Sequence, residues 1–179
     1  MFLLERHIEE FNRMILFRSS SKLLAIPNYF EMVDKNDIIP ISERQNIILF
    51  VGRVEITQKR CDLLMKIWEE LYNILPDYSF VLIGEGSFLS SFQARFDKEK
   101  YSRIKILGKT DPEVWYKKAR ILNFTSSYEG LGNVLIESQT YGVVPIAFNS
   151  YSGVEELVKS GETGVIVDFP NISKFVSCL

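Results

Sequence analysis

Two glutamates, Glu129 and Glu137, stand eight residues apart in a segment whose pattern changes from strand to helix. The apolar stretch 121–125 indicates a short strand that ends in a Ser-Ser-Tyr-Glu-Gly turn. From Gly132 the pattern is helical as far as Gly142, a typical helix C-cap. A glycine-bearing turn from a strand into a helix directs free backbone N–H groups and the positive end of the helix dipole at one spot. The segment therefore predicts an anion site flanked by two carboxylates.

The spacing of the two carboxylates suggests the shape of a ligand. Glu129 lies in the turn before the expected anion site, and Glu137 lies about 7–8 Å along the helix at a rise of ~1.5 Å per residue. One ligand could then place a polyhydroxyl group at Glu129, a diphosphate at the helix start and a diol at Glu137. A sugar joined through a diphosphate to ribose has this layout. Either glutamate alone would more often be an ordinary solvated residue.

The surrounding residues carry a family resemblance. The run Glu129-Gly-Leu-Gly-Asn-Val-Leu-Ile-Glu137, followed by Tyr141-Gly-Val-Val-Pro-Ile-Ala147, resembles the donor-site signature of retaining glycosyltransferases of family 4. These are the group 1 glycosyltransferases, which have the GT-B fold. The resemblance implies an α/β fold, a doubly wound Rossmann-like sheet of about six parallel strands that forms the C-terminal half of a GT-B enzyme.

An upstream loop resembles the phosphate loop of the same family. The strand-like run Ile48-Leu-Phe-Val-Gly-Arg-Val54 is followed by Gln58-Lys-Arg-Cys-Asp-Leu-Leu64. In the family an arginine and a lysine straddle the donor diphosphate, which here would be Arg53 and Lys59. A strand that ends at a glycine allows the tight turn that lets two cations converge on a diphosphate. Taken alone, the two cations fit solvated loop charges equally well. Arg60 departs from the family pattern, because many relatives have glycine there.

The resemblance continues downstream and covers approximately residues 22–170. Ser152-Gly-Val-Glu-Glu-Leu-Val158 and Gly161-Glu-Thr-Gly-Val-Ile-Val167 match segments that close the donor domain. It implies that Arg53, Lys59 and Glu129 are catalytic. It implies that the donor contacts Gly52, Arg53, Lys59, Gly84, Gly86, Gly108, Glu129, Gly130, Leu131, Gly132, Asn133 and Glu137.

Composition excludes several other classes of protein. The 179 residues are 46% apolar and 25% charged, as in ordinary globular domains, and are enough for one core. A net charge of −2 and a pI near 5.6 argue against a nucleic-acid partner. No apolar run reaches the ~18 residues of a membrane span. The two cysteines form neither a disulfide framework nor a zinc motif, so we expect a cytoplasmic setting, extending to the inner face of the membrane.

From residue 45 onward, strands and helices alternate regularly. Runs such as 47–51, apolar on both faces, are typical of a parallel sheet covered on both sides. We expect strands at 47–51, 79–83, 103–107, 120–125, 143–148 and 163–168. We expect helices at 58–75, 86–97, 111–118, 132–142 and 152–159. Ligands of such folds bind at the carboxyl ends of the strands.

That rule adds two more loops to the expected site, Gly84-Glu-Gly86 and Gly108-Lys-Thr-Asp111. In the resembling family these loops hold the nucleotide base, largely through main-chain groups. Two other motifs are rejected. The first loop has Leu89 where a dinucleotide fingerprint needs its third glycine, and the second has Arg103 where a P-loop needs its first.

The ends of the chain suggest a fragment of a longer enzyme. Residues 1–18 read as an amphipathic helix and 22–26 as a short strand, which we interpret together as a remnant, 1–26, of an N-terminal acceptor domain. Residues 27–45 read as a linker, and 46–179 as a donor domain that stops early. The acceptor domain would then be a missing partner. We expect Phe2, Leu4, Phe11 and Phe175 to be exposed where they face missing parts, and to favour self-association.

For the full enzyme, the resemblance implies hexose transfer from a UDP- or GDP-linked sugar with retention of configuration, without a metal or another cofactor. The acceptor would be a saccharide or a lipid-linked saccharide of cell-surface polysaccharide synthesis, which suggests peripheral membrane association. A non-catalytic nucleotide-sugar-binding module is the alternative. A hydrolase that uses Glu129 and Glu137 is weaker, since no raised-pKa setting is evident. The single histidine, His7, supports no triad or metal site.

Overall fold

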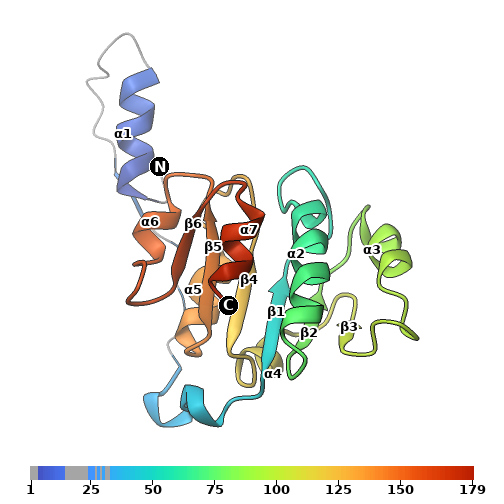
Figure 1. The fold of residues 1–179 in the computed structure, drawn as a ribbon. Coiled ribbons are helices and arrows are strands. Elements are labelled where there is room, and N and C mark those ends of the chain that lie inside the picture. Colours follow the sequence, from blue (N-terminus) through green and yellow to red (C-terminus); the bar gives the residue numbers. More distant parts are fainter. Residues whose placement is uncertain (1–3, 15–23, 27, 29, 31–32) are drawn as a thin grey trace.

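The computed structural model describes residues 4–14, 24–26, 28, 30 and 33–179, and its centre is one parallel sheet (Figure 1). The sheet has six strands in the order β3-β2-β1-β4-β5-β6, and every pair is parallel. The strands are β1 (Ile47–Val51), β2 (Ser79–Ile83), β3 (Ile104–Ile106), β4 (Ile121–Phe124), β5 (Val144–Asn149) and β6 (Val165–Asp168). All six predicted strands are confirmed, with ends shifted by at most a few residues.

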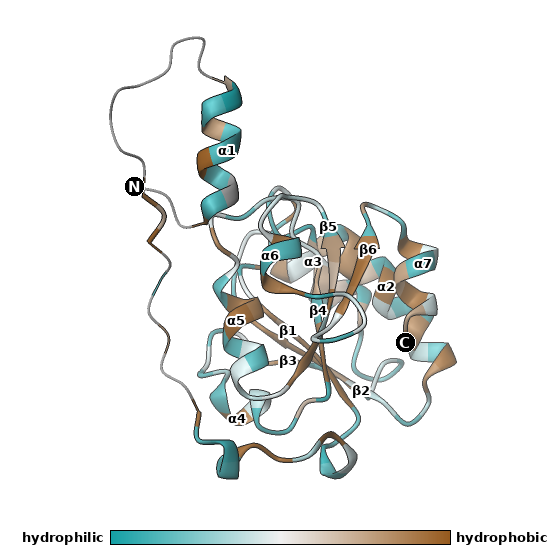
Figure 2. Cartoon of the chain, turned by 90° about the vertical axis from the view of Figure 1, so that its left-hand side faces the viewer, coloured by the Kyte–Doolittle hydropathy of each residue, from teal (hydrophilic) through white to brown (hydrophobic). Residues whose placement is uncertain are grey.

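Helices cover both faces of the sheet, as the apolar strands require. The helices of the sheet domain are α2 (Cys61–Ile74), α3 (Leu89–Arg95), α4 (Glu113–Tyr116), α5 (Asn133–Thr140), α6 (Val154–Leu157) and α7 (Ile172–Ser177). One buried layer joins α2, α3 and α7 to residues such as Ile48 and Phe50, and the other joins α4, α5 and α6 to Ile47 and Leu49. Figure 2 shows mostly hydrophobic strands at the centre, with helices that mix hydrophobic and hydrophilic residues around them. The predicted helices exist, but each is shorter than its periodic segment.

The strand order fixes where a ligand can bind. The chain runs outward from β1 to β2 and β3 and then returns to place β4 on the other side of β1. The neighbouring strands β1 and β4 therefore mark the switch point of the sheet, where ligands of doubly wound folds bind at the carboxyl ends of the strands. The loops after β1 and β4 carry the arginine–lysine pair and the first glutamate. The topology therefore brings both predicted motifs to one point.

The described part of the segment before the sheet includes short helical elements. It contains α1 (Glu5–Met14) and two short 3-10 turns, η1 (Lys35–Asp37) and η2 (Ile41–Glu43). Arg44 is buried and donates to the carbonyls of Ile39 at 2.7 Å and Ala119 at 2.9 Å, which fastens the segment to the end of α4. Burial lowers the pKa of Arg44.

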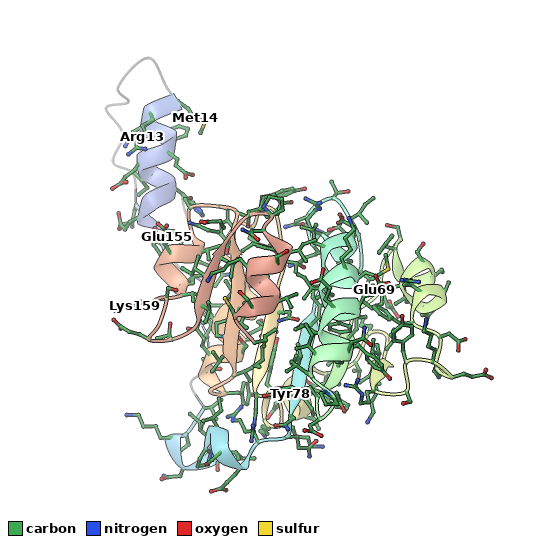
Figure 3. All side chains as sticks on the ribbon, viewed as in Figure 1. Arg13, Met14, Glu69, Tyr78, Glu155 and Lys159 are labelled. Carbon is green, nitrogen blue, oxygen red and sulfur yellow. The ribbon has the colours of Figure 1, made fainter. Side chains whose placement is uncertain are left out.

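The described part of the leading segment contains the expected helix but not the expected strand. The helix expected over 1–18 is described as α1, and residues 1–3 and 15–18 lie outside the described residues. The strand expected over 22–26 is wrong for its described part, which shows only a single bridge residue at Ala25. Figure 3 places Arg13 and Met14 at the end of α1 that is distant from the sheet. None of the helices in the described part of the chain is long and apolar enough to cross a bilayer.

Two apolar residues that we expected to be exposed are buried. Leu4 is 7% exposed, and its methyl lies 2.6 Å from where a Cβ on Gly153 would stand, so it covers the start of α6. Phe175 is fully buried, with its ring 4.7 Å from that of Phe148. The domain's own helices supply the cover that we had assigned to missing parts. Phe11 is half-buried, and Phe2 lies outside the described residues.

Candidate functional site

The loops after β1, β2 and β3 form a continuous backbone rim. The N–H of Gly52 donates to Ile83 at 3.0 Å, and the N–H of Gly84 donates to Gly108 at 2.8 Å. Gly84 has φ +150°, and a Cβ there would overlap the carbonyl oxygen of Gly52. Gly86 stands in the same relation to the carbonyl of Val54. Glycine is therefore required at 84 and 86 by the close approach of neighbouring loops.

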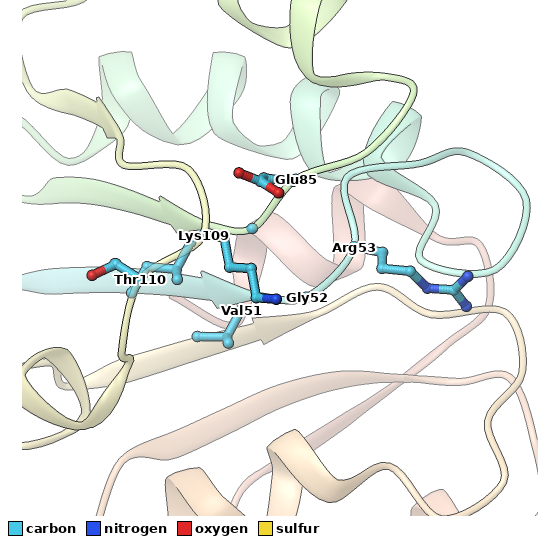
Figure 4. Close-up of a pocket in the computed structure, with 8 residues that line it drawn as sticks. Val51, Gly52, Arg53, Glu85, Lys109 and Thr110 are labelled. Carbon is cyan, nitrogen blue, oxygen red and sulfur yellow. The ribbon is translucent and has the colours of Figure 1, made fainter.

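A cavity of about 380 Å³ opens over this rim (Figure 4). It is lined by Val51, Gly52, Arg53, Ile83, Gly84, Glu85, Lys109 and Thr110. In Figure 4 the side chain of Lys109 runs toward Gly52, whereas that of Arg53 extends away from Glu85 and Thr110. An apolar floor with a few polar groups at its edge is typical of a small-molecule site. The predicted glycines at 52 and 84 are part of this cavity.

The loop between β1 and α2 is held by a residue that the sequence did not single out. The Glu55 carboxylate accepts from the backbone N–H groups of Thr57 at 2.8 Å, Gln58 at 3.0 Å and Lys59 at 2.6 Å. Burial opposes the charge of Glu55, but the donors of Lys59, Gln58 and Thr57 outweigh it and lower its pKa. Glu55 thus fixes the loop that presents Lys59.

Arg60, the departure from the family pattern, follows Lys59 in a left-handed conformation with φ 51°. It is the only non-glycine residue with positive φ in the described part of the chain. Such a conformation suits glycine and costs other residues ~1–2 kcal/mol. The guanidinium donates to both oxygens of Asp62, at 2.9 and 2.8 Å, and lies over the ring of Phe169. These contacts offset part of the backbone strain.

The carboxylate of Glu129 is surrounded by donors from two loops. Oε1 lies 2.5 Å from Lys59 Nζ and accepts from Ser126 Oγ at 2.8 Å. Oε2 accepts from Gln58 Nε2 at 3.0 Å. The side chains of Lys59 and Glu129 are 12% and 11% exposed. The sequence placed these two residues at different parts of one ligand, whereas the structure joins them directly.

Arg53 is linked to Glu129 through the side chain of Gln58. One of its terminal nitrogens donates to Oε1 of Gln58, whose amide nitrogen faces Glu129. The three predicted catalytic residues are therefore linked side chain to side chain. Gln58 was overlooked because an uncharged loop residue gives no chemical signal in the sequence.

The glycine turn before α5 has the predicted form. Gly132 caps the helix with φ 81°, and a Cβ there would overlap the Tyr151 hydroxyl. That hydroxyl donates to the carbonyl of Leu131 at 3.2 Å. Burial, and secondarily the charge of Glu129, raise the pKa of Tyr151, so the phenol stays protonated as a donor. Asn133, the first residue of α5, accepts from Asn28 at 2.9 Å.

Glu137 lies on α5 and faces a separate cavity of about 250 Å³. Its Oε2 accepts from the hydroxyl of Tyr116 at 3.1 Å. Burial, then the neighbouring charge of Glu137, raise the pKa of Tyr116. The cavity is lined by Phe30, Asp111, Pro112, Glu113, Tyr116, Glu137, Thr140 and Tyr141. Glu137 thus lines a different cavity from the one lined by Gly52, Arg53 and Gly84. In the part of the chain that the structure describes, no three His, Cys, Asp or Glu residues are grouped to hold a metal.

Comparison with known proteins identifies the class that this fold and site define. The family model described as glycosyl transferases group 1 matches residues 33–178. The chain belongs to this family of glycosyltransferases.

Curated relatives include two bacterial glycosyltransferases. A GalNAc-alpha-(1->4)-GalNAc-alpha-(1->3)-diNAcBac-PP-undecaprenol alpha-1,4-N-acetyl-D-galactosaminyltransferase of Campylobacter jejuni is 30% identical over 147 residues, which cover 82% of this chain and 40% of that protein. A lipopolysaccharide 1,6-galactosyltransferase of Salmonella typhimurium is 28% identical over 162 residues, 81% of this chain and 42% of that protein. The chain spans less than half the length of these relatives.

Solved structures support the fold. Staphylococcus aureus TarM, determined with fondaparinux, alpha-GlcNAc-glycerol and UDP, matches with a TM-score of 0.85 at 22% identity, over 98% of this chain and 35% of that one. The lipopolysaccharide outer core galactosyltransferase WaaB matches with a TM-score of 0.75 at 23% identity, over 95% and 48% of the two chains. The sheet domain is the Rossmann-like unit of GT-B glycosyltransferases.

Proposed function

We propose that this chain binds the nucleotide-sugar donor of a retaining glycosyltransferase and supplies the groups that stabilise the departing nucleotide diphosphate. The observation that carries the proposal is the grouping of Arg53, Lys59 and Glu129, linked directly or through Gln58, in the loops after β1 and β4. Two cations and a carboxylate at the strand ends suit a ligand that combines phosphate charge with sugar hydroxyls.

The proposed chemistry needs charge stabilisation more than proton transfer at this half of the site. The bond between the anomeric carbon and the phosphate oxygen breaks, which leaves an oxocarbenium-like sugar and negative charge on the diphosphate. The acceptor hydroxyl then bonds to the anomeric carbon on the same face and passes its proton to the leaving phosphate oxygen. Arg53, Lys59 and the start of α5 at Leu131–Asn133 would stabilise that charge in place of a metal.

The two glutamates would position the ends of the donor. Glu129 would accept hydroxyls of the hexose, and Glu137 would accept the ribose diol. Lys59 is held by Glu129, so a diphosphate must share or replace that contact. The cavity lined by Glu85 and Lys109 would receive the base. TarM was solved with UDP, which makes UDP the first nucleotide to test.

The acceptor is proposed from the relatives. One relative acts on an undecaprenol-linked saccharide and another is a lipopolysaccharide galactosyltransferase. We therefore propose a saccharide or lipid-linked saccharide acceptor for the complete enzyme, and its peripheral association with a cytoplasmic membrane face.

Donor binding is tested first by a thermal-shift panel of UDP, GDP, ADP and their sugars. A ligand that binds the native state raises Tm according to its concentration and affinity. The open site should give weak binding, with Kd on the order of 0.1–1 mM. A panel in which no nucleotide or nucleotide sugar raises Tm at 10 mM would contradict the proposal.

Transfer is tested separately. The purified chain is incubated with labelled UDP- and GDP-sugars and a mixture of saccharide and lipid-linked acceptors. We expect binding without transfer, because the advantage of holding two reactants together, up to ~7–11 kcal/mol, needs an acceptor site as well. Adding an acceptor domain encoded nearby should restore transfer. A module that only binds nucleotide sugars would stay inactive with every such domain.

A further inference from the structure

The side-chain amide of Gln58 lies between the residues proposed for the two ends of the donor. Its Oε1 accepts from the guanidinium of Arg53. Its Nε2 donates to Oε2 of Glu129 at 3.0 Å and to the carbonyl of Tyr128 at 3.1 Å. Both donors of the amide nitrogen and its carbonyl oxygen are thus used.

A side-chain amide matches the three hydrogen-bond partners around Gln58. A carboxamide presents an acceptor on one side and two donors on the other, whereas a carboxylate is acceptor-only. The arginine requires an acceptor, and the carboxylate of Glu129 and the Tyr128 carbonyl require donors. The orientation of the amide follows from its partners.

The backbone of Gln58 is fixed on both sides. Its N–H donates to Glu55 at 3.0 Å. Its carbonyl accepts from the N–H of Ser127 at 2.7 Å and from the hydroxyl of Ser127 at 3.1 Å. Gln58 is therefore anchored to both loops, and its amide contacts Arg53 from one loop and Glu129 from the other.

We propose that Gln58 is a positioning residue that couples the diphosphate contact of Arg53 to the sugar contact of Glu129. The inference rests on the proposed function. With Gln58 in place, a sugar that engages Glu129 meets a carboxylate already aligned with the arginine that holds the phosphates. The residue should therefore matter more for a nucleotide sugar than for the nucleoside diphosphate alone.

The test compares Kd values for UDP with UDP-glucose, and for GDP with GDP-mannose, by calorimetry on the full chain. Gln58→Met keeps the length of the side chain and removes its polar atoms. We expect it to weaken diphosphate binding ~2–3-fold and nucleotide-sugar binding ~10-fold, as expected for one and two lost hydrogen bonds. Gln58→Glu keeps the acceptor for Arg53 but places a carboxylate against Glu129. It should also lower the preference for the sugar-bearing ligand.

Ser127→Ala is the matched control. It removes a hydroxyl that donates to the main-chain carbonyls of Thr57 at 2.9 Å and Gln58 at 3.1 Å, and so joins the same two loops without a contact to the side chains of Gln58, Arg53 or Glu129. A purely structural effect of loop contact would change both ligands of a pair by the same factor. The sugar preference should therefore persist in Ser127→Ala and fall in both Gln58 variants.

A double-mutant cycle locates the effect. Once Glu129→Gln has removed the carboxylate, Gln58→Met should no longer lower the sugar preference, because coupled residues are not additive. An undiminished effect in that background, or an unchanged preference in both Gln58 variants, would overturn the inference while leaving donor binding intact. A wild-type chain that binds neither pair of ligands would instead overturn the proposed function, and this inference with it.

Discussion

The hydroxyl of Tyr116 donates to Oε2 of Glu137 across 3.1 Å, from the end of α4 to the middle of α5. Tyr116 is 2% exposed, so water does not compete with the carboxylate for its hydroxyl. The hydrogen bond therefore orients the Glu137 carboxylate in the cavity that both residues line. If Glu137 accepts a ribose diol, Tyr116 determines which oxygen is free to do so.

Glu137→Gln should weaken binding of ribonucleotides, and the loss should shrink for 2′-deoxy or 3′-deoxy analogues. Tyr116→Phe should give a smaller loss of about 0.5–1.5 kcal/mol, the net range for one hydrogen bond. Calorimetry with UDP and its deoxy analogues measures both. Equal losses for ribose and deoxyribose ligands would show that Glu137 does not contact the sugar.

Arg53→Ala should weaken diphosphate binding by about 1.5–3 kcal/mol, because the lost hydrogen bonds are to a charged group. Arg95→Ala is a suitable control, since Arg95 pairs with Glu69 on the outer side of α2, away from the site. Calorimetric titration with UDP should leave the control unchanged. An Arg53 variant with wild-type affinity would remove Arg53 from the donor site.

Gly84→Ala should destabilise the fold by roughly 2–4 kcal/mol, because its Cβ would overlap the neighbouring loop and its φ of +150° is strained for alanine. Gly161 also has a positive φ, of +84°, but the methyl added by Gly161→Ala would stand in open space. The substitution should cost only about 1–2 kcal/mol. Urea unfolding of the two variants separates steric overlap from backbone strain. Equal losses would mean that the rim can open.

Arg60→Gly should leave the free energy of unfolding within about 1 kcal/mol of wild type. Relief of the left-handed strain, ~1–2 kcal/mol, is offset by greater freedom of the unfolded chain and by loss of the pair with Asp62. Arg60→Val keeps the strain and loses the pair, and so should be clearly less stable. Urea midpoints measure this difference in stability. A valine variant as stable as the glycine variant would show that the left-handed backbone at position 60 is not strained.

Burial raises the pKa of the Cys61 thiol from 9.0 to about 12. The unfolded chain loses this proton at lower pH than the native state does, so the stabilisation is full below about pH 9 and is lost as pH rises toward 12. Stability of the wild type should therefore fall more steeply across that window than stability of Cys61→Ala. Urea unfolding at several pH values measures the difference. Parallel curves would indicate that the thiol titrates normally.

The fold was predictable because strands that are apolar on both faces indicate a parallel sheet covered by helices. Ile47–Val51 illustrates this, since a run with no polar face must lie in a covered parallel sheet. In such a sheet, ligands bind at the carboxyl ends of the strands. The same rule predicted that the loops carrying Arg53 and Glu129 lie at one edge. The identity of residues at the site followed from motifs, but their partners did not.

Side-chain partners depend on loop conformations that periodicity does not specify. Lys59 meets Glu129 across 70 positions in the chain because Glu55 holds the loop of Lys59, and Ser126 donates to Glu129 within the other loop. Burial of Leu4 was missed for a related reason. A short apolar segment near a chain end gives no sign of which part of the fold it will contact. Here Leu4 packs against the start of α6.

The tight contact of Gly84 and Gly86 with the carbonyls of Gly52 and Val54 has a consequence for engineering. The main chain of the rim tolerates no added carbon at 84 or 86, so substituting those glycines could not retune the nucleobase preference that we propose for this cavity. Under that proposal, a change of base would be sought in the polar side chains of the cavity other than Arg53, which are those at 85, 109 and 110. A saturation library confined to these three positions would sample donor preference while leaving the scaffold beneath it unchanged.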